Sequence, residues 1–248
     1  MILNLQYLRA FAAINVVLFH IIGTATAYGY KPNFFSYLEG WGSNGVDIFF
    51  VISGFVMYYI QYHKKRSSIE FFKLRLVRIL PMYWFVTFIV IAAMYSLPST
   101  NFNNSPPEFQ KIIESLFFLS GAMSKETPIV YVGWTLEWEI LFYLIISFSL
   151  FFKTKFQSIG FVILTLFLIS YFSREYIVLE FLYGMLVAFT FFNFKLSKNF
   201  GLILFILGFT LLILTLALDF DKQNRFLFWG GPSMLIVLGA VFAPQINN

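Results

Sequence analysis

The sequence predicts an all-α membrane protein, a polytopic bundle of about eight transmembrane helices with a cytoplasmic N-terminus. The first reason is composition: of 248 residues, 59% are hydrophobic and 12% charged, whereas a soluble domain carries about a quarter charged residues. The 35 phenylalanines are more apolar surface than a core of this size can hide from water. The second reason is the recurrence of apolar runs of membrane-spanning length, and the third is the placement of the basic residues.

Short polar segments divide the chain into eight apolar runs. Each run is close to the ~20 residues that cross the hydrocarbon layer. The predicted spans are residues 7–24, 46–62, 79–97, 134–152, 156–173, 177–194, 200–218 and 226–242. Residues 112–122 are apolar but too short to span, so they predict an interfacial or re-entrant piece, and residues 98–108 predict a loop. No internal repeat is visible, and the whole chain, 1–248, is expected to form one domain.

Basic residues fix the expected orientation. The HKKR stretch at 63–66 and three further cations lie between the second and third spans, and two lysines lie in each of the loops 153–155 and 195–198. All of these loops fall on one side if eight spans alternate, and most acidic loop residues fall on the other. The positive-inside rule then places the basic side and the N-terminus in the cytoplasm. No cleavable signal peptide is expected, because Arg9 interrupts the first apolar run.

The lack of cysteine and the scarcity of histidine limit the kinds of catalytic or metal site that the chain can form. The sequence has no cysteine and only two histidines, which excludes a thiol nucleophile and disulfides and disfavours a multi-histidine metal site. Neither a bound metal nor a bound cofactor is expected, and no nucleic-acid partner. Acid, base and cationic chemistry within the spans is what remains.

Arg9 and His20 lie eleven residues apart in the first predicted span. On a helix this is three turns plus about 20°, so both side chains share a face, separated by ~16 Å along the axis. Arg9 is either a snorkelling anchor or a functional cation. His20 is either a hydrogen-bonded packing residue or a general base, and an imidazole inside a span favours the second reading.

Asp47 opens the second predicted span in the stretch GVDIFFVISGF at 45–55. Its position favours a helix N-cap, since an aspartate accepts backbone N–H bonds at the positive end of a helix. The alternative is that its carboxylate orients His20. Gly54 in the same stretch is expected to allow close helix packing. Glu180, near another span entrance, is ambiguous.

Residues 71–81, FFKLRLVRILP, predict an interfacial helix on which Arg75 and Arg78 share a face. The simpler interpretation of this arginine pair is that it anchors the helix to lipid head groups. The more specific hypothesis is that it binds phosphate, because a guanidinium matches phosphate geometry.

The stretch VGWTLEWEILFY at 132–143 is the densest polar cluster in the predicted spans. Thr135, Glu139 and Tyr143 recur every four residues on one face, while Glu137 points elsewhere. A carboxylate this deep needs a partner, for which Arg9, an arginine of 71–81 and His20 are candidates. Trp134 also fits an interfacial aromatic belt. These features do not separate a transferase from a proton-coupled transporter.

Taken in order, these motifs resemble the acyltransferase-3 family of integral membrane acyltransferases. They are Arg9-x10-His20, GVDIFFVISGF, Arg75-x-x-Arg78 before a proline, WTLEWEILFY and LEFLYGMLVA at 179–188. The LQYLRAFAA start and the VGWTLEWE form are most similar to the exopolysaccharide-production branch. The resemblance covers nearly the whole chain.

The resemblance implies an O-acyltransferase of the bacterial inner membrane. Its donor would be acyl-CoA, acetyl-CoA by default, and its acceptor a hydroxyl of an exopolysaccharide, a surface glycan or a lipid-linked saccharide. By position, His20 would be the catalytic histidine, with Arg9 and Glu139 as motif partners. Arg75 and Arg78 would bind acyl-CoA phosphates. Asp47, Trp134 and Tyr143 would support the site.

Two other readings stay open. One is a transporter or flippase of lipid-linked sugars, although internal repeats and broken midplane helices would be more typical of that class. The other is an inactive truncated relative. Family members typically have about ten spans and end in a Ser-Tyr-x-x-Tyr-Leu-x-His type segment, whereas this sequence ends in APQINN after the eighth predicted span.

The aromatic residues Tyr28, Tyr30, Tyr37 and Trp41 are candidates for sugar stacking or for the interfacial belt.

Overall fold

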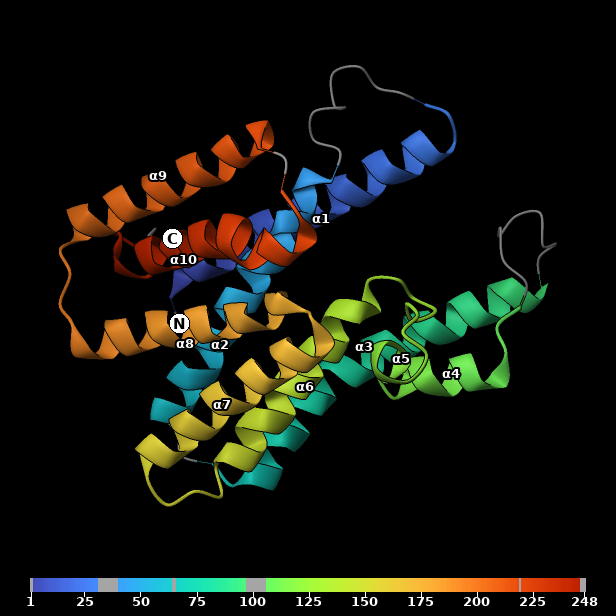
Figure 1. Ribbon diagram of the computed structural model, residues 1–248, viewed down its shortest axis with the longest axis horizontal. Coiled ribbons are helices and arrows are strands. Elements are labelled where there is room, and N and C mark those ends of the chain that lie inside the picture. Colours follow the sequence, from blue (N-terminus) through green and yellow to red (C-terminus); the bar gives the residue numbers. More distant parts are fainter. Residues whose placement is uncertain (1, 31–39, 64–65, 97–105, 219, 246–248) are drawn as a thin grey trace. The chain divides into compact units, whose positions relative to one another are not determined.

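The computed structural model describes residues 2–30, 40–63, 66–96, 106–218 and 220–245. Within these ranges every regular element is a helix and none is a strand, which confirms the all-α prediction (Figure 1). The longer helices are α1 (Leu3–Ala27), α2 (Asn44–His63), α3 (Ser68–Ser96), α6 (Gly133–Ser149), α7 (Lys155–Ser173), α8 (Glu180–Asn193), α9 (Lys198–Leu214) and α10 (Gly231–Phe242). The shorter pieces are η2 (Trp41–Ser43), α4 (Phe109–Leu116), α5 (Ser120–Met123), η3 (Tyr176–Leu179), η4 (Thr215–Ala217), η5 (Lys222–Asn224) and the π-helical turn η6 (Phe226–Gly230).

Six of the predicted spans coincide with helices that are long and apolar enough to cross a membrane. These helical stretches are Leu3–Ala27, Trp41–Gln61, Ser68–Ser96, Lys155–Ser173, Tyr176–Asn193 and Lys198–Ala217. The eighth predicted span is the shorter apolar helix Phe226–Phe242, and the fourth is the 17-residue α6. The chain is therefore a multi-pass membrane protein, while the count of eight and the side of the N-terminus stay predictions.

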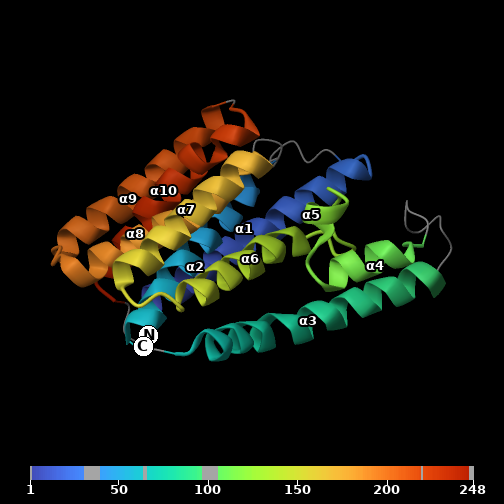
Figure 2. The same ribbon diagram turned by 60° about the horizontal axis from the view of Figure 1, so that its bottom comes forward.

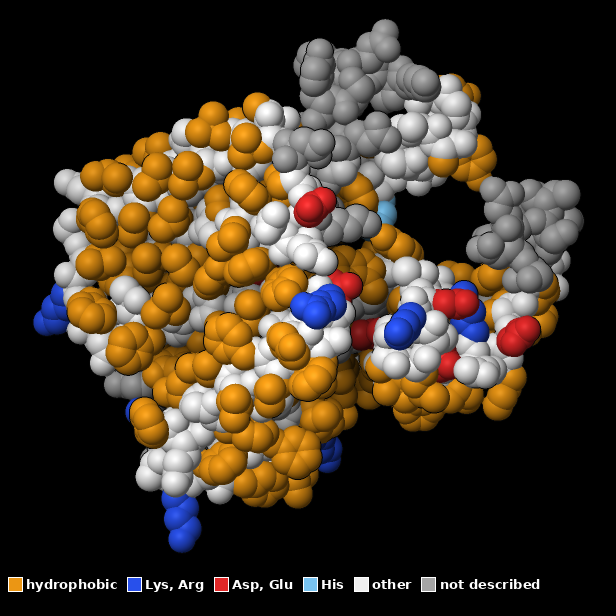
Figure 3. Space-filling view, viewed as in Figure 1, with side chains coloured by type: hydrophobic (Ala, Val, Ile, Leu, Met, Phe, Trp, Pro, Cys, Tyr) orange, Lys and Arg blue, Asp and Glu red, His pale blue; other side chains and the backbone are white. Residues whose placement is uncertain are grey.

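The chain divides into two compact units. The first comprises Met1–Lys65 and Ile163–Asn248, and the second comprises Arg66–Val162, so that the boundary falls inside α7. In the first unit α9 and α10 lie side by side (Figure 2). The surface over α8 and α9 is almost wholly hydrophobic (Figure 3), as expected of helices that face lipid.

A close helix crossing in the first unit joins α2 to α8. A Cβ added to Gly54 would overlap the backbone oxygen of Phe181, and one added to Gly184 would overlap the backbone oxygen of Val51. Small residues that let helix backbones touch are a main device of membrane helix packing. The expectation that Gly54 allows close packing is confirmed.

We expect Gly184→Ala to lower the stability of the folded protein by about 1–3 kcal/mol, because an extra methyl group at a backbone contact is overpacking. The measurement is the thermal unfolding midpoint of the purified protein in detergent. Gly160→Ala is the matched control, because a Cβ at this α7 position meets nothing within 4 Å. Equal midpoints for the two variants would contradict the crossing described here.

In the second unit α3 packs on α6. The Ser68 hydroxyl donates to the backbone oxygen of Ser147 at 2.7 Å, and the Ser147 hydroxyl donates back to that of Ser68 at 2.8 Å. Residues 71–81 and the third predicted span form one continuous helix, α3, with Pro81 inside it. Proline inside a helix removes one N–H donor and crowds the preceding turn, yet α3 continues through Pro81, so the predicted interfacial helix is the first part of a longer helix.

The apolar stretch 112–122 is too short to span, as predicted, because α4 ends at Leu116 and α5 begins at Ser120. The turn between them carries Phe118 at a φ of 59°. Tyr83 and Trp84 of α3 donate to the backbone oxygens of Ser115 and Leu116 at 3.1 and 3.0 Å. These bonds tie α4 to α3.

Candidate functional site

Helix α1 runs without interruption through Arg9 and His20. The helical spacing derived from the sequence therefore applies, and both side chains lie on one face, ~16 Å apart along the axis. Both are half-buried, and the His20 ring meets the Phe19 ring edge-on, with centroids 5.0 Å apart. The first unit thus holds the predicted catalytic histidine and its motif arginine on one rigid element.

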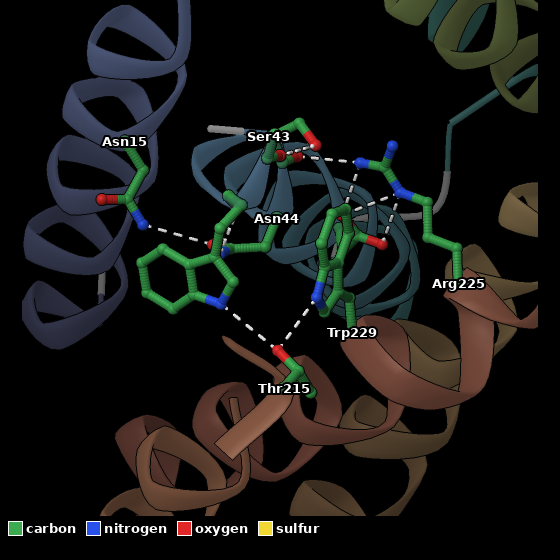
Figure 4. Close-up of polar contacts among 9 residues, drawn as sticks. Asn15, Ser43, Asn44, Thr215, Arg225 and Trp229 are labelled. Atoms are coloured by element: carbon green, nitrogen blue, oxygen red, sulfur yellow. Dashed lines mark hydrogen bonds and ion pairs between the residues drawn. The ribbon is translucent and has the colours of Figure 1, made fainter. Parts of the chain in front are cut away.

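A second face of α1 holds the helix against α2. Asn15 is buried, and its amide donates to the Asn44 side-chain oxygen at 3.2 Å (Figure 4). A Cβ on Gly42 would lie 2.6 Å from the Asn15 backbone oxygen, so α1 and η2, the turn that leads into α2, are in backbone contact. Asn15 lies about 120° around α1 from Arg9. The amide pair and the glycine contact fix α1 against α2, and Val16, which shares the face of Arg9 by helical spacing, also meets α2 at Gly45.

Asp47 lies in the first turn of α2, which begins at Asn44, so the predicted N-cap is wrong. Its side chain is fully buried and carries an ion pair instead. Arg225 Nε donates to both carboxylate oxygens, at 3.0 and 3.2 Å, and Arg225 Nη2 donates to Oδ2 at 2.7 Å and to the Ser43 backbone oxygen at 2.8 Å. A buried carboxylate requires a partner of this kind, and Arg225 takes the carboxylate that the alternative reading assigned to His20.

Arg225 is held from a second side by Trp229, whose ring lies 4.8 Å from the guanidinium carbon. Burial alone lowers the pKa of Arg225, and the adjacent Asp47 carboxylate outweighs burial, so that its pKa is raised. The indole N–H groups of Trp229 and Trp41 both donate to the Thr215 hydroxyl, at 3.0 and 3.2 Å (Figure 4). The loop before α10 is therefore fastened to the start of α2.

The sequence makes Trp41 a candidate for sugar stacking or for the interfacial belt. In the structure its indole N–H donates hydrogen bonds inside the first unit, one of them to the Thr215 hydroxyl. It also donates to the Leu212 backbone oxygen at 3.1 Å. Tyr28 and Tyr30 are exposed, at 76% and 73%, and stay candidates for either role. Tyr37 lies outside the described residues.

The second unit contains the other predicted site residues. Arg75 of α3 is 7% exposed, and its Nε has no hydrogen-bond acceptor within the described part of the chain. Its guanidinium carbon lies 5.7 Å from the centre of the Phe71 ring. Arg66 and Arg78 add positive charge near it, while Tyr143 and Glu139 of α6 favour its charged form. A buried guanidinium with a free donor is suited to an anionic ligand.

The Glu139 carboxylate accepts a hydrogen bond from the Tyr143 hydroxyl. The predicted shared face of these two residues on α6 is confirmed, and Glu139 is near enough to Arg75 of α3 to act on its charge, while the ion-pair partner of Glu139 stays a prediction. Glu137 has a different task, because its carboxylate accepts the backbone N–H groups of Ser120 and Gly121 at 3.2 and 3.0 Å. It caps the start of α5. Trp134 is half-buried on α6, and its role stays a prediction.

Arg225 is the residue that sequence reasoning missed. It lies 178 positions from Asp47 in the chain, and no local pattern joins the two. The sequence did offer one indication that Asp47 has a cationic partner, because a carboxylate at the entrance of an apolar helix needs a cation. Arg225 is one of few cations in the loops that the predicted topology places opposite the basic ones.

These features define a multi-pass helical membrane protein with buried acidic, basic and cationic side chains in its spans. Residues 2–247 match the model of the acyltransferase-3 family, which is described as an acyltransferase domain. The chain therefore belongs to the acyltransferase-3 family.

A relative with a curated description is the exopolysaccharide production protein ExoZ of Rhizobium meliloti (strain 1021), which is 39% identical over 114 residues. The aligned stretch covers 44% of this chain and 35% of ExoZ. No solved structure matches the chain.

Proposed function

We propose that the protein is an O-acyltransferase of the bacterial inner membrane. It would transfer an acyl group, acetyl by default, from acyl-CoA to a hydroxyl of an exopolysaccharide or another surface glycan. The observation that carries this proposal is the buried Arg75 guanidinium with an unused donor, in a chain that belongs to an acyltransferase family. The similarity to ExoZ supports a glycan acceptor.

In this proposal the arginine cluster binds the donor. Arg75 and Arg78 contact the phosphates of CoA, and Arg66 adds a third positive charge. The Glu139–Tyr143 hydrogen bond keeps a carboxylate beside Arg75, so that the guanidinium is held in place before the phosphate arrives. Preorganised charge of this kind lowers the cost of ordering the ligand.

His20 performs the chemistry in this proposal. Its imidazole takes the proton of the acceptor hydroxyl while the oxygen attacks the thioester carbonyl, the C–S bond breaks, and CoA leaves as the thiolate. Alternatively, the imidazole attacks first and carries the acyl group to the sugar. Arg9 shares the face of His20 on α1 but lies ~16 Å from it along the axis, so in this proposal it lines the path of the acyl-bearing arm of CoA and does not contact the reacting carbonyl.

The test is acetyl-CoA binding to the purified protein in nanodiscs. We expect Arg75→Ala to weaken binding by about 10- to 100-fold, because a charge-assisted hydrogen bond contributes ~1.5–3 kcal/mol. Lys73→Ala is the matched control, since it removes one exposed positive charge from the same helix outside the cluster. Acetyl-pantetheine, which lacks the phosphates, should bind to wild type and Arg75→Ala equally.

The outcomes separate cleanly. Equal weakening by Lys73→Ala and Arg75→Ala would reduce the effect to general electrostatic attraction. Absence of acetyl-CoA binding by the folded wild-type protein would overturn the proposed donor.

A further inference from the structure

Glu180, at the start of α8, is a buried acid that the proposed acyl transfer does not use. Its side chain is fully buried, and neither carboxyl oxygen has a hydrogen-bond donor among the described residues. An isolated carboxylate in such surroundings costs several kcal/mol. Glu180 therefore requires either a cationic partner or a bound proton.

The Asp47 carboxyl lies next to that of Glu180. The charged and titratable groups around the pair are Arg225 before η6, Tyr183 on α8 itself, and Glu175 before η3, which acts on Arg225. Asp47, Glu180 and Arg225 together carry one negative charge more than positive if both acids are ionised. Two adjacent carboxylates in a site of low dielectric do not both ionise.

The bonding pattern tells the two acids apart. Arg225 makes three hydrogen bonds to the Asp47 oxygens, so Asp47 is the ionised partner. Glu180 receives none. An O–H on Glu180 aimed at Asp47 would satisfy both acids at once.

We infer that Asp47 and Glu180 form a proton-binding site in which Glu180 holds the proton and donates a hydrogen bond to the Asp47 carboxylate. The site joins α2 to α8 at the ends where both helices begin, on the same helix pair as the Gly54–Gly184 crossing. It does not depend on the proposed acyl transfer. With the proton bound, the two helices meet there without repulsion between their acids.

A metal cation fits this place less well than a proton. A bound cation needs several oxygen ligands around it, and the Gly230 backbone occupies one side of the Glu180 carboxyl. A Cβ on Gly230 would lie 2.9 Å from Glu180 Cγ and 2.9 Å from its Oε1. A proton needs no such room.

The test is infrared difference spectroscopy of the purified protein at pH 7, which separates the C=O band of a protonated carboxylic acid from the bands of carboxylates. We expect the acid band in wild type, with a shift in D₂O, and its loss in Glu180→Gln. Glu114→Gln is the matched control, because Glu114 is also buried but accepts the Gln110 amide at 2.7 Å, which lowers the pKa of Glu114. The acid band should survive in that variant.

Thermal unfolding gives a second readout. Glutamine keeps the shape of the acid and offers Asp47 an N–H donor, so Glu180→Gln should unfold at the wild-type midpoint. A higher midpoint would show that an ionised Glu180 repels Asp47 in the wild type and would overturn the inference. So would an acid band that persists in Glu180→Gln, or a wild-type spectrum that lacks the band and changes between sodium and potassium salts.

Discussion

Replacement of His20 by alanine is expected to reduce acyl transfer by about 10²- to 10⁴-fold, which is the usual contribution of a positioned general base. The imidazole is half-buried on α1, and alanine suits a helix interior. Folding should therefore survive while the base is lost. The measurement is release of free CoA from acetyl-CoA in the presence of a glycan acceptor.

His63→Ala is the matched control for this experiment. His63 is the second histidine of the chain and is exposed at the end of α2, where its ring contacts those of Tyr59 and Phe192. We expect the activity of this variant to equal that of wild type. Full activity of a correctly folded His20→Ala protein would remove His20 from the mechanism.

The second large effect is expected at the Asp47–Arg225 ion pair. Asp47→Ala should destabilise the protein by about 3–5 kcal/mol, because it leaves a buried guanidinium without its counter-charge. Arg225→Ala should cost a similar amount, since it leaves Asp47 beside Glu180 with no cation. The measurement is unfolding in detergent, and Asp221→Ala, at an exposed aspartate, is the control.

The double variant sharpens this prediction. Asp47→Ala combined with Arg225→Ala removes both charges, so its cost should be well below the sum of the two single costs. Strict additivity of the two costs would show that the residues act independently and would contradict the pairing.

The parts of this structure that could be predicted from sequence are those that local residue patterns indicate. The runs of apolar residues locate the helices, because hydrophobic length is set by the bilayer itself. The four-residue spacing of Glu139 and Tyr143 predicts their shared face, and the structure joins them by a hydrogen bond. The same reasoning places Arg9 and His20 on one side of α1.

Contacts between distant segments could not be predicted in this way. Asp47 looked like a helix cap because an aspartate at a helix start usually is one, and only the fold brings Arg225 to it. Likewise, the meeting of Trp41 and Trp229 on Thr215 joins three segments that no spacing rule connects. The sequence predicts an interfacial helix over residues 71–81, whereas in the structure this stretch continues through Pro81 into the third predicted span.

The proposed function is transfer of an acyl group from acyl-CoA to a glycan hydroxyl. The most direct measurement is incubation of the wild-type protein in nanodiscs with acetyl-CoA labelled in its acetyl group and a lipid-linked saccharide. We expect a labelled acetyl ester on the saccharide, removable by mild base, and one free CoA released for each ester formed. Movement of the saccharide across reconstituted vesicles without any consumption of acetyl-CoA would rule out acyl transfer and identify a transporter.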